Sequence, residues 1–278
     1  MRTIFSLRSG RLLLFLMFFI KQSLGFSQSL PLANAFAHND YWHKRPLYDA
    51  LDNGYVHIEA DVYLRGNNII VAHILPVLKK KRTLEKLYLK PLQECIDGTG
   101  KRADCPSYPL TLLIDIKSDA EKTYRELDIL LQKYKAILSS VEQGHYTQRQ
   151  VTIVISGHKP FQLLKSQSTR FAFIDEDLKK VDQDTTAKNF YQTASCKYSS
   201  LIRWKGQGSF PEIEKQRLCQ YVSMAHRFGK KVRLWSSPEN PAVWNALLQC
   251  GVDLINTDKL LELKNFLSRP GILSANVN

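Results

Sequence analysis

YVHIEADV, at residues 55–62, alternates polar and apolar side chains along its whole length. This is the period of a β-strand with two unlike faces. Glu59 and Asp61 therefore point in the same direction, away from the valine and isoleucine side chains, near the carboxyl end of the strand. One strand of this kind would also fit a half-exposed antiparallel sheet, so the fold depends on what surrounds it.

A second stretch, LTLLIDIK at residues 110–117, repeats the pattern. Its apolar residues at positions 112, 114 and 116 share one face, and Asp115 and Lys117 share the other. The polar pair again stands at the carboxyl end. Two strands that end in charged side chains predict a common polar site if the strands are parallel neighbours.

The rest of the chain alternates strand-like and helix-like segments without a break in composition. Further strands are expected near residues 35–38, 69–72, 151–155, 171–174, 200–204, 231–235 and 252–257. Helices are expected at residues 46–53, 83–94 with an interruption at Pro91, 120–139, 161–165, 211–228, 241–249 and 259–267. The pattern predicts an α/β protein with a (β/α)₈ TIM-barrel fold, as a single domain over residues 31–270. A doubly wound open sheet is the alternative, but no glycine-rich phosphate loop follows the first strand.

The first 27 residues differ from the rest. Basic residues Arg2, Arg8 and Arg11 precede an apolar run at 12–20 and small residues at 23–25, which is typical of a secretory signal peptide. The run is short for a bilayer span, and a membrane anchor or buried N-terminal helix is the alternative. We therefore expect a secreted or periplasmic protein.

The chain is basic, with a net charge of +13 that falls to +9 if residues 1–27 are removed. A basic surface suits an anionic membrane or a phosphorylated small molecule. The densest run, Lys79-Lys80-Lys81-Arg82, is either a solvated loop or a headgroup-binding patch. Aromatic residues do not interleave with it, so no nucleic acid partner is expected. The sequence does not define the oligomeric state.

Five cysteines permit disulfides in an exported chain. Cys95 and Cys105 flank a turn-rich loop and are the best candidate pair. The alternative is that all five are reduced. Their spacing does not suggest a zinc site.

The residues suited to chemistry stand at strand ends, where a barrel of this type has its active site. Acid–base groups, oxygen ligands for a hard cation and a counter-charge for phosphate are all present. They are His38, Asn39, Glu59, Asp61, His73, Asp115 and Lys117. Trp235 points into the same mouth together with Arg233 if the strand phase is right, and would there contact the substrate, with core packing as the alternative. Ser156-Gly157 also ends a strand, and the simplest interpretation is a turn.

Five segments together resemble a known superfamily. They are AHNDY at 37–41, IEADV at 58–62, VAH at 71–73, LLIDIKSD at 112–119 and GVDLINTD at 251–258. In this order they resemble the PI-PLC-like phosphodiesterase superfamily, which includes the glycerophosphodiester phosphodiesterases. The branch most similar to them is that of the altered inheritance of mitochondria proteins and their bacterial relatives.

The resemblance implies roles for these residues. Glu59, Asp61, Asp115 and Asn39 would hold Ca²⁺ or Mg²⁺. His38 and His73 would act as general base and general acid, and Lys117 would neutralise charge on the non-bridging oxygens of the substrate phosphate. Glycerophosphodiesterases usually have Arg where this chain has Asn39, and Glu where it has Asp115. Those two positions look like phospholipase C and sphingomyelinase D relatives instead.

Two function hypotheses follow. The first is an exported, metal-dependent phosphodiesterase that cleaves a glycerol-, inositol- or lipid-linked phosphodiester, through water or through a neighbouring hydroxyl. The second is a barrel that binds a phospholipid or phosphosugar without turnover. The two histidines favour the first hypothesis, because binding alone needs no proton transfer.

Overall fold

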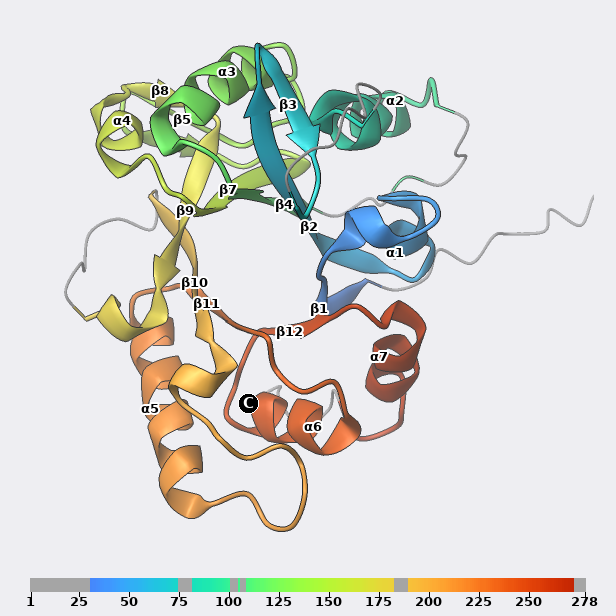
Figure 1. The fold of residues 1–278 in the computed structure, drawn as a ribbon, viewed down its shortest axis with the longest axis vertical. Helices are drawn as coiled ribbons and strands as arrows, with labels where there is room; N and C mark the ends of the chain where they lie inside the picture. The colour runs from blue at the N-terminus through green and yellow to red at the C-terminus, as the bar shows by residue number, and fades with distance from the viewer. Residues whose placement is uncertain (1–30, 75–81, 101–104, 106–108, 183–189, 273–278) are drawn as a thin grey trace, which may run out of the picture.

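Eight parallel strands pair edge to edge and close into a ring, because β1 pairs with both β12 and β2 (Figure 1). The computed structural model describes residues 31–74, 82–100, 105, 109–182 and 190–272. The barrel strands are β1 (Leu32–Ala37), β2 (Tyr55–Arg65), β4 (Leu110–Ile116), β7 (Val151–Gly157), β9 (Ala172–Asp177), β10 (Tyr191–Lys197), β11 (Lys231–Trp235) and β12 (Leu254–Thr257). The predicted TIM barrel is confirmed.

Helices surround this ring on the outside (Figure 1). The α-helices are α1 (Tyr48–Asp52), α2 (Lys90–Ile96), α3 (Ala120–Gln132), α4 (Phe161–Ser166), α5 (Glu212–Arg227), α6 (Pro241–Gln249) and α7 (Leu260–Leu267). Short turns of other helix types are η1 (Asp40–Trp42), η2 (Glu85–Leu89), η3 (Leu178–Lys180) and η4 (Tyr198–Ser200). Within the described residues, no helix has the length and apolarity needed to cross a bilayer.

Four further strands lie outside the ring. β3 (Asn68–Val71) pairs antiparallel with the extended end of β2, at the place where a strand was expected near residues 69–72. β5 (Ser140–Glu142), β6 (His145–Thr147) and β8 (Thr169–Arg170) form a separate small sheet. The hairpin of β2 and β3 matters for function, because it carries His73 back to the mouth of the barrel.

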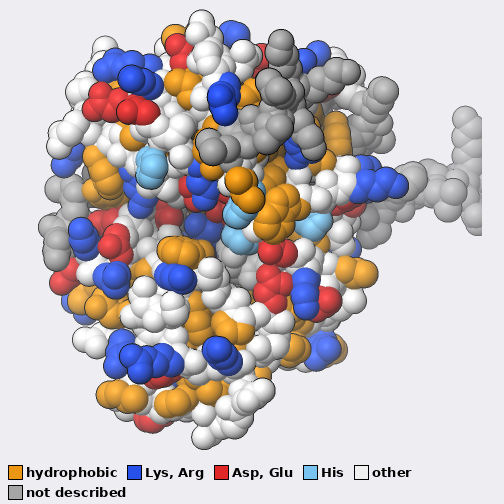
Figure 2. Space-filling view, viewed as in Figure 1, with side chains coloured by type: hydrophobic (Ala, Val, Ile, Leu, Met, Phe, Trp, Pro, Cys, Tyr) orange, Lys and Arg blue, Asp and Glu red, His pale blue; other side chains and the backbone are white. Residues whose placement is uncertain are grey.

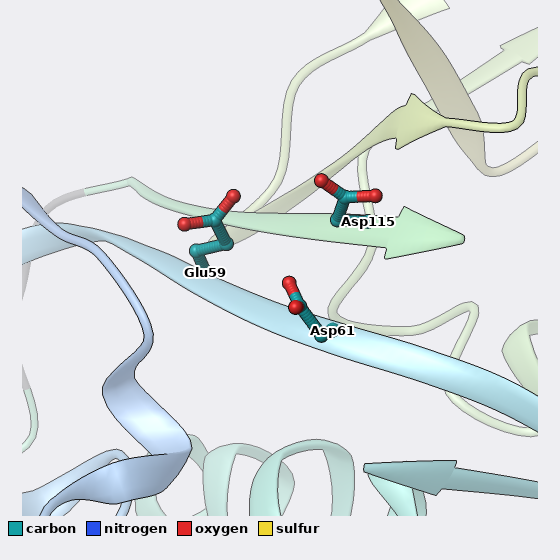
Figure 3. A group of neighbouring side chains, drawn as sticks. All are labelled: Glu59, Asp61 and Asp115. Atoms are coloured by element: carbon teal, nitrogen blue, oxygen red, sulfur yellow. The ribbon is translucent and has the colours of Figure 1, made fainter. Parts of the chain in front are cut away.

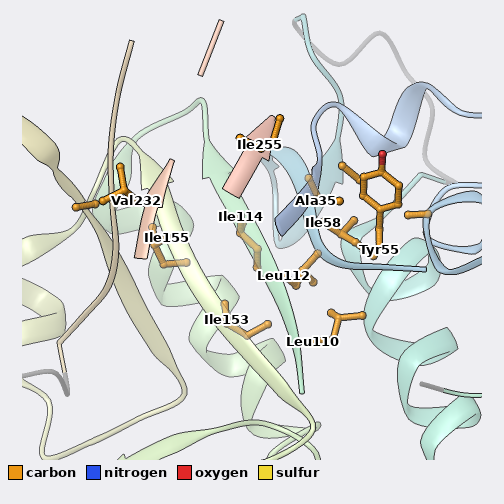
Figure 4. Close-up of a cluster of buried hydrophobic side chains, with 14 of the residues drawn as sticks. Ala35, Tyr55, Ile58, Leu110, Leu112, Ile114, Ile153, Ile155, Val232 and Ile255 are labelled. Atoms are coloured by element: carbon orange, nitrogen blue, oxygen red, sulfur yellow. The ribbon is translucent and has the colours of Figure 1, made fainter. Parts of the chain in front are cut away.

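The two faces of each barrel strand have different neighbours. Outward-facing residues such as Ile58, Ile114 and Ile155 are fully buried in the main apolar core between strands and helices (Figure 4). A second apolar cluster of Phe36, Leu113, Val154 and Leu254 has the opposite strand phase and fills the inside of the ring. Polar side chains lie beyond this inner cluster, toward the carboxyl ends of the strands. The alternation seen in the sequence therefore separates a packed wall from a polar mouth.

The sixth barrel strand was placed wrongly by sequence pattern. A strand was expected at residues 200–204, but β10 spans Tyr191–Lys197 and residues 200–204 form a turn and loop. Thr193 and Ser195 face inward, where their hydroxyls donate to the carboxylate of Asp175. Because these inward-facing residues are polar, the segment lacks the apolar run by which the other strands were predicted.

Helix α3 ends at Gln132, earlier than the predicted Ser139. Leu138 forms a parallel bridge to Val151, and the chain then enters β5. In this segment, strand pairing in the folded chain therefore outweighs the helix propensity of the residues. The predicted signal peptide at residues 1–27 and the lysines at 79–81 lie outside the described residues.

Two disulfides are present, Cys95–Cys105 and Cys219–Cys250, and Cys196 is buried and free. Only the first pair was expected. The second joins the middle of α5 to the end of α6, and a separation of 31 residues gave no local turn signal for it.

Replacing Cys219 and Cys250 by Ser should lower the free energy of unfolding by about 2–4 kcal/mol, because the unfolded chain loses a long cross-linked loop. The measurement is urea unfolding of oxidised protein. The double Cys95→Ser, Cys105→Ser variant is the matched control and should lose less, since its loop spans only 10 residues. Equal losses from the two pairs would contradict the loop-length argument.

Candidate active site

The carboxyl ends of the barrel strands border one cleft of about 670 Å³. All eight residues singled out in the sequence line this cleft: His38, Asn39, Glu59, Asp61, His73, Asp115, Lys117 and Trp235. They come from five different strand ends, which only a closed ring brings together. On the same face of the molecule, histidine side chains group near the centre, with acidic and basic side chains next to them (Figure 2).

Three carboxylates form the most compact group in the cleft. Glu59 and Asp61 extend from β2 and Asp115 from β4, with the three groups turned toward one another (Figure 3). One oxygen from each lies within 4.8 Å of the others. Asp61 and Asp115 are direct partners across the two strands, an arrangement that destabilises like charges.

The carboxylate oxygens also have unmet bonding capacity. Oε2 of Glu59 and Oδ1 of Asp115 are buried without a hydrogen-bond partner. Leaving buried charged oxygens unsatisfied is costly, and oxygen ligands are those that Ca²⁺ and Mg²⁺ prefer. The donor set therefore fits a hard divalent cation.

Two basic side chains partly neutralise this group. Lys117 Nζ lies 3.2 Å from Asp61 Oδ2 and 3.1 Å from Asp115 Oδ2. Burial raises the pKa of Asp61, and the ammonium of Lys117 only partly opposes this. Burial likewise raises the pKa of Glu59 against the effect of Arg233. The resident cations leave negative charge uncompensated at this end of the cleft.

Arg233 supports the carboxylates from below the cleft surface. It is buried on β11, with Nη1 3.1 Å from Asn256 Oδ1 and 3.5 Å from Glu59 Oε1. Its guanidinium also lies 3.7 Å from Asp175 Oδ2 and above the ring of Phe36. These contacts hold one oxygen of Glu59 and leave the other directed at the cleft.

His38 is oriented by a carboxylate from the last barrel strand. Its Nδ1 lies 2.7 Å from Asp258 Oδ1, and its Nε2 lies 3.6 Å from Glu59 Oε2. A carboxylate can only accept, so this bond places a proton on Nδ1 and leaves Nε2 to face the cleft. Burial by itself lowers the pKa of His38, but the hydrogen bond to Asp258 and the charge of Glu59 raise it more.

His73 lies just beyond β3 and contacts a different carboxylate from His38. Its Nδ1 lies 3.1 Å from Asp61 Oδ2 and 3.0 Å from the hydroxyl of Tyr41. The edge of Trp42 packs against the imidazole, with ring centroids 4.9 Å apart. The two histidines thus approach two different members of the carboxylate group, Glu59 and Asp61.

Asn39 is placed by backbone conformation. It has φ of 48°, a left-handed conformation that Asn adopts more readily than most residues. Its Oδ1 accepts a hydrogen bond of 2.6 Å from Tyr41, and its Nδ2 donates to Asp258 Oδ1. In this arrangement Oδ1 of Asn39 already accepts a hydrogen bond.

Gly157 does more than form a turn, because its lack of a side chain leaves space for Asp115. A Cβ on this residue would lie 2.0 Å from Asp115 Oδ1 and 2.5 Å from the carbonyl oxygen of Ile116, and its φ is +68°. Glycine at the end of β7 therefore leaves the space that the Asp115 carboxylate occupies.

Two residues of the site, Tyr41 and Asp258, were not among the predicted ones, and Arg233 was expected only to point into the mouth with Trp235. Asp258 follows the end of β12, so the strand-end rule that selected Asp115 could have selected it too. Tyr41 carried no such signal. The contacts that Arg233 makes with Glu59 and Asp175 depend on neighbours distant in sequence.

Comparisons with known proteins agree with this geometry. The AIM6-like phosphodiesterase domain family matches residues 25–175, and the glycerophosphoryl diester phosphodiesterase family matches residues 231–260. Together with the barrel, these matches define a phosphodiesterase-type domain of the PI-PLC-like superfamily. The first match covers more than half of the chain, which belongs to the family of AIM6-like phosphodiesterase domains.

Several fungal proteins are similar over most of the chain. Altered inheritance of mitochondria protein 6 of Eremothecium gossypii is 29% identical, covering 84% of this chain and 69% of the relative. The homolog in Arthroderma benhamiae is 26% identical, covering 83% and 82%. The predicted superfamily and branch are confirmed.

A solved structure shares the fold. It is a calcium-dependent phosphoinositol-specific phospholipase C from a Gram-negative Pseudomonas species, with a TM-score of 0.54 and 13% sequence identity. The similarity covers 84% of this chain and 92% of the other. It supports the barrel architecture.

Gly157→Ala should destabilise the protein by more than the strain of a left-handed alanine, about 1–2 kcal/mol, because the new methyl group also displaces Asp115. Urea unfolding measures the loss. Gly66→Ala is the matched control, since Gly66 also has positive φ but nothing within 4 Å of an added Cβ. The same loss in both variants would show that the contact with Asp115 is not a constraint.

Proposed function

We propose that this chain is an exported, metal-dependent phosphodiesterase that cleaves a glycerol-, inositol- or lipid-linked phosphodiester. The single observation that carries the proposal is the carboxylate group with two histidines beside it in one cleft. A site for binding alone would not need two imidazoles beside the charged group.

Glu59, Asp61 and Asp115 would hold the divalent cation, either Ca²⁺ or Mg²⁺. The ion would supply charge stabilisation for the oxygens of the reacting phosphate. Support comes from the two buried carboxylate oxygens that lack partners. Asn39 is the weaker ligand candidate, because binding a cation would require its oxygen to leave Tyr41.

His38 is suited to act as the general base. Asp258 fixes the imidazole with a hydrogen bond at Nδ1, so Nε2 is available to accept a proton from the attacking oxygen. The attacking oxygen belongs to water or to a neighbouring hydroxyl of the substrate. As the new bond to phosphorus forms, the proton passes to Nε2.

His73 is suited to act as the general acid. It contacts Asp61, whereas His38 approaches Glu59, and from this separate position it can protonate the oxygen that leaves phosphorus. Lys117 contacts Asp61 and Asp115 and would neutralise charge on the non-bridging oxygens once phosphate enters. In the absence of phosphate, its ammonium is held by Asp61 and Asp115.

Export is supported by the N-terminal sequence pattern and by the cysteines. Disulfides persist mainly in oxidising compartments, and this chain has two pairs at bonding distance. The basic net charge is compatible with contact at an anionic membrane.

Addition of Ca²⁺ or Mg²⁺ should raise the melting temperature, because the ion binds only the folded carboxylate group. Asp115→Asn should weaken the binding measured by calorimetry at least about tenfold, the effect of losing a charged oxygen ligand. Glu121→Gln removes an exposed carboxylate on α3 and should change nothing. Equal affinities in the two variants, or no binding of either ion, would refute the metal site.

Turnover of a panel of glycerol-, inositol- and choline-linked diesters with Ca²⁺, Mg²⁺ or chelator tests the activity. His38→Ala and His73→Ala should each lower kcat/KM by about 10²–10⁴ while leaving the affinity for a non-hydrolysable diester analogue intact. His145→Ala, on the exposed strand β6, is the matched control. Absence of turnover across the panel would favour the binding barrel, and rates unaffected in both variants would reject His38 and His73 as the acid–base pair.

A further inference from the structure

Neither a strand nor a helix holds His73. It lies in a bend just beyond β3, and its side chain is 44% exposed. His38, in contrast, has a carboxylate partner in Asp258 that fixes its imidazole. An acid that must meet one particular oxygen needs an equally well defined position. The contacts of the His73 imidazole therefore decide whether it can serve as the acid.

Two oxygen atoms contact Nδ1 of His73. They are Asp61 Oδ2 at 3.1 Å and the hydroxyl of Tyr41 at 3.0 Å. The Asp61 oxygen is shared, because Lys117 Nζ lies 3.2 Å from the same atom and a cation held by the carboxylates would compete for it as well. The contact with Tyr41 uses no carboxylate oxygen, so it does not depend on which cation these carboxylates hold.

The direction of the bond between Tyr41 and His73 follows from the other contacts of the hydroxyl. Its oxygen lies 2.6 Å from Asn39 Oδ1, and the carboxylate of Asp61 is also a hydrogen-bond partner. Both partners accept, so the single hydroxyl proton is directed to one of them, and the Tyr41 oxygen can only accept from His73. The neutral imidazole therefore keeps its proton on Nδ1, and Nε2 is the nitrogen that can give up a proton.

The side-chain amide of Asn39 has a defined orientation, because the carboxylate of Asp258 can only accept. Nδ2 of Asn39 and Nδ1 of His38 lie 2.9 Å apart, and both donate to the same oxygen of Asp258. The reversed amide would place its oxygen against that carboxylate. One carboxylate thus reaches both histidines, the first directly and the second through an amide and a hydroxyl.

Tyr41 is itself well fixed. Its side chain belongs to the main apolar core, and its carbonyl oxygen accepts a hydrogen bond from the guanidinium of Arg82. Trp42, the next residue of η1, packs against the imidazole of His73, and the hydroxyl of Tyr63 donates to the carbonyl oxygen of the same histidine. A buried tyrosine close to the first histidine in sequence therefore supports the second.

We propose that Tyr41 is a positioning residue for the general acid: its hydroxyl, oriented by the amide of Asn39, keeps the Nδ1 proton of His73 in place while Nε2 delivers its proton. This inference rests on the proposed function, in which His73 protonates the leaving oxygen. In that step the bond from phosphorus to this oxygen breaks, the proton of Nε2 passes to the oxygen, and the imidazole is left neutral with Nδ1 still protonated. Tyr41 acts through His73 and needs no contact with the substrate.

The kinetic test uses Tyr41→Phe in the full chain, which removes the hydroxyl and keeps the buried ring. Two substrates share the phosphorylated group cleaved in the diester panel and differ in the leaving alcohol, hexanol or p-nitrophenol. Hexanol needs a proton to leave, whereas p-nitrophenol leaves as a stable anion. The variant should lower kcat for the hexyl ester at least about tenfold, a part of the roughly 10²- to 10⁴-fold effect of a positioned acid, and should change kcat for the p-nitrophenyl ester less than about twofold. KM should stay the same for both esters.

Tyr124→Phe is the matched control. Tyr124 is fully buried and would lose a hydrogen bond to Gln167, but it does not line the cleft, so kcat for both esters should be unchanged. An equal loss for the two esters in Tyr41→Phe would overturn the inference, because a general effect on the fold does not distinguish leaving groups. So would a kcat for the hexyl ester as high as that of the control.

A measurement on the ring itself needs no turnover. In ¹⁵N NMR at about pH 8.5, where imidazole side chains are ordinarily neutral, His73 should show the Nδ1–H form in the unmodified chain, with its signals assigned through their loss in His73→Ala. In Tyr41→Phe both nitrogen shifts should move toward the average of the two tautomers, and in Tyr124→Phe they should stay.

The two measurements separate this inference from the proposed function. An Nε2–H ring in the unmodified chain, or unmoved shifts in Tyr41→Phe, would overturn the inference even if diesters are cleaved. The expected shifts without turnover of any diester would reject the proposed function and keep Tyr41 as the residue that fixes the His73 ring.

Discussion

Three carboxylates lie close together in a buried space at the mouth of the barrel. The side chains around them partly compensate this concentration of negative charge. Asp61 and Asp115 face each other across neighbouring strands, and burial raises the pKa values of Glu59 and Asp61. Lys117 and Arg233 bring positive charge to the group without satisfying every oxygen. Such a group is costly to fold unless a cation completes it, so the feature that destabilises the mouth is also the one that points to function.

The barrel is stable because side chains alternate between the two faces of each strand, and this separates the polar group from the apolar core. Outward-facing aliphatic side chains build the main core with the helices, and a small inner cluster closes the barrel beneath the polar residues. Each buried aliphatic side chain contributes about 1.5–3 kcal/mol, so many of them can offset a few unfavourable charges. The site lies at the carboxyl ends of the strands, where few side chains are needed to fill the core and where the loops can vary.

Much of the fold could be predicted from sequence because most strands have an apolar outward face next to a helix. The exception is instructive. Thr193 and Ser195 make the inner face of β10 polar, because they solvate the carboxylate of Asp175, and that strand was missed. The site was predicted in outline for a related reason: charged residues at the ends of apolar strands stand out. Tyr41 did not, because nothing local in the sequence distinguishes a buried hydroxyl with a distant partner, and strand phase placed Arg233 in the mouth without indicating its carboxylate partners.

By itself the sequence determined which residues face the mouth, since strand phase is a local property of alternating side chains. Which of those residues meet was decided only by the closed ring. Closure brings Asp258 near the end of the chain to His38 near its start. The reason is that hydrogen-bonded strand order, unlike side-chain alternation, joins segments more than 200 residues apart, and no local pattern encodes that distance.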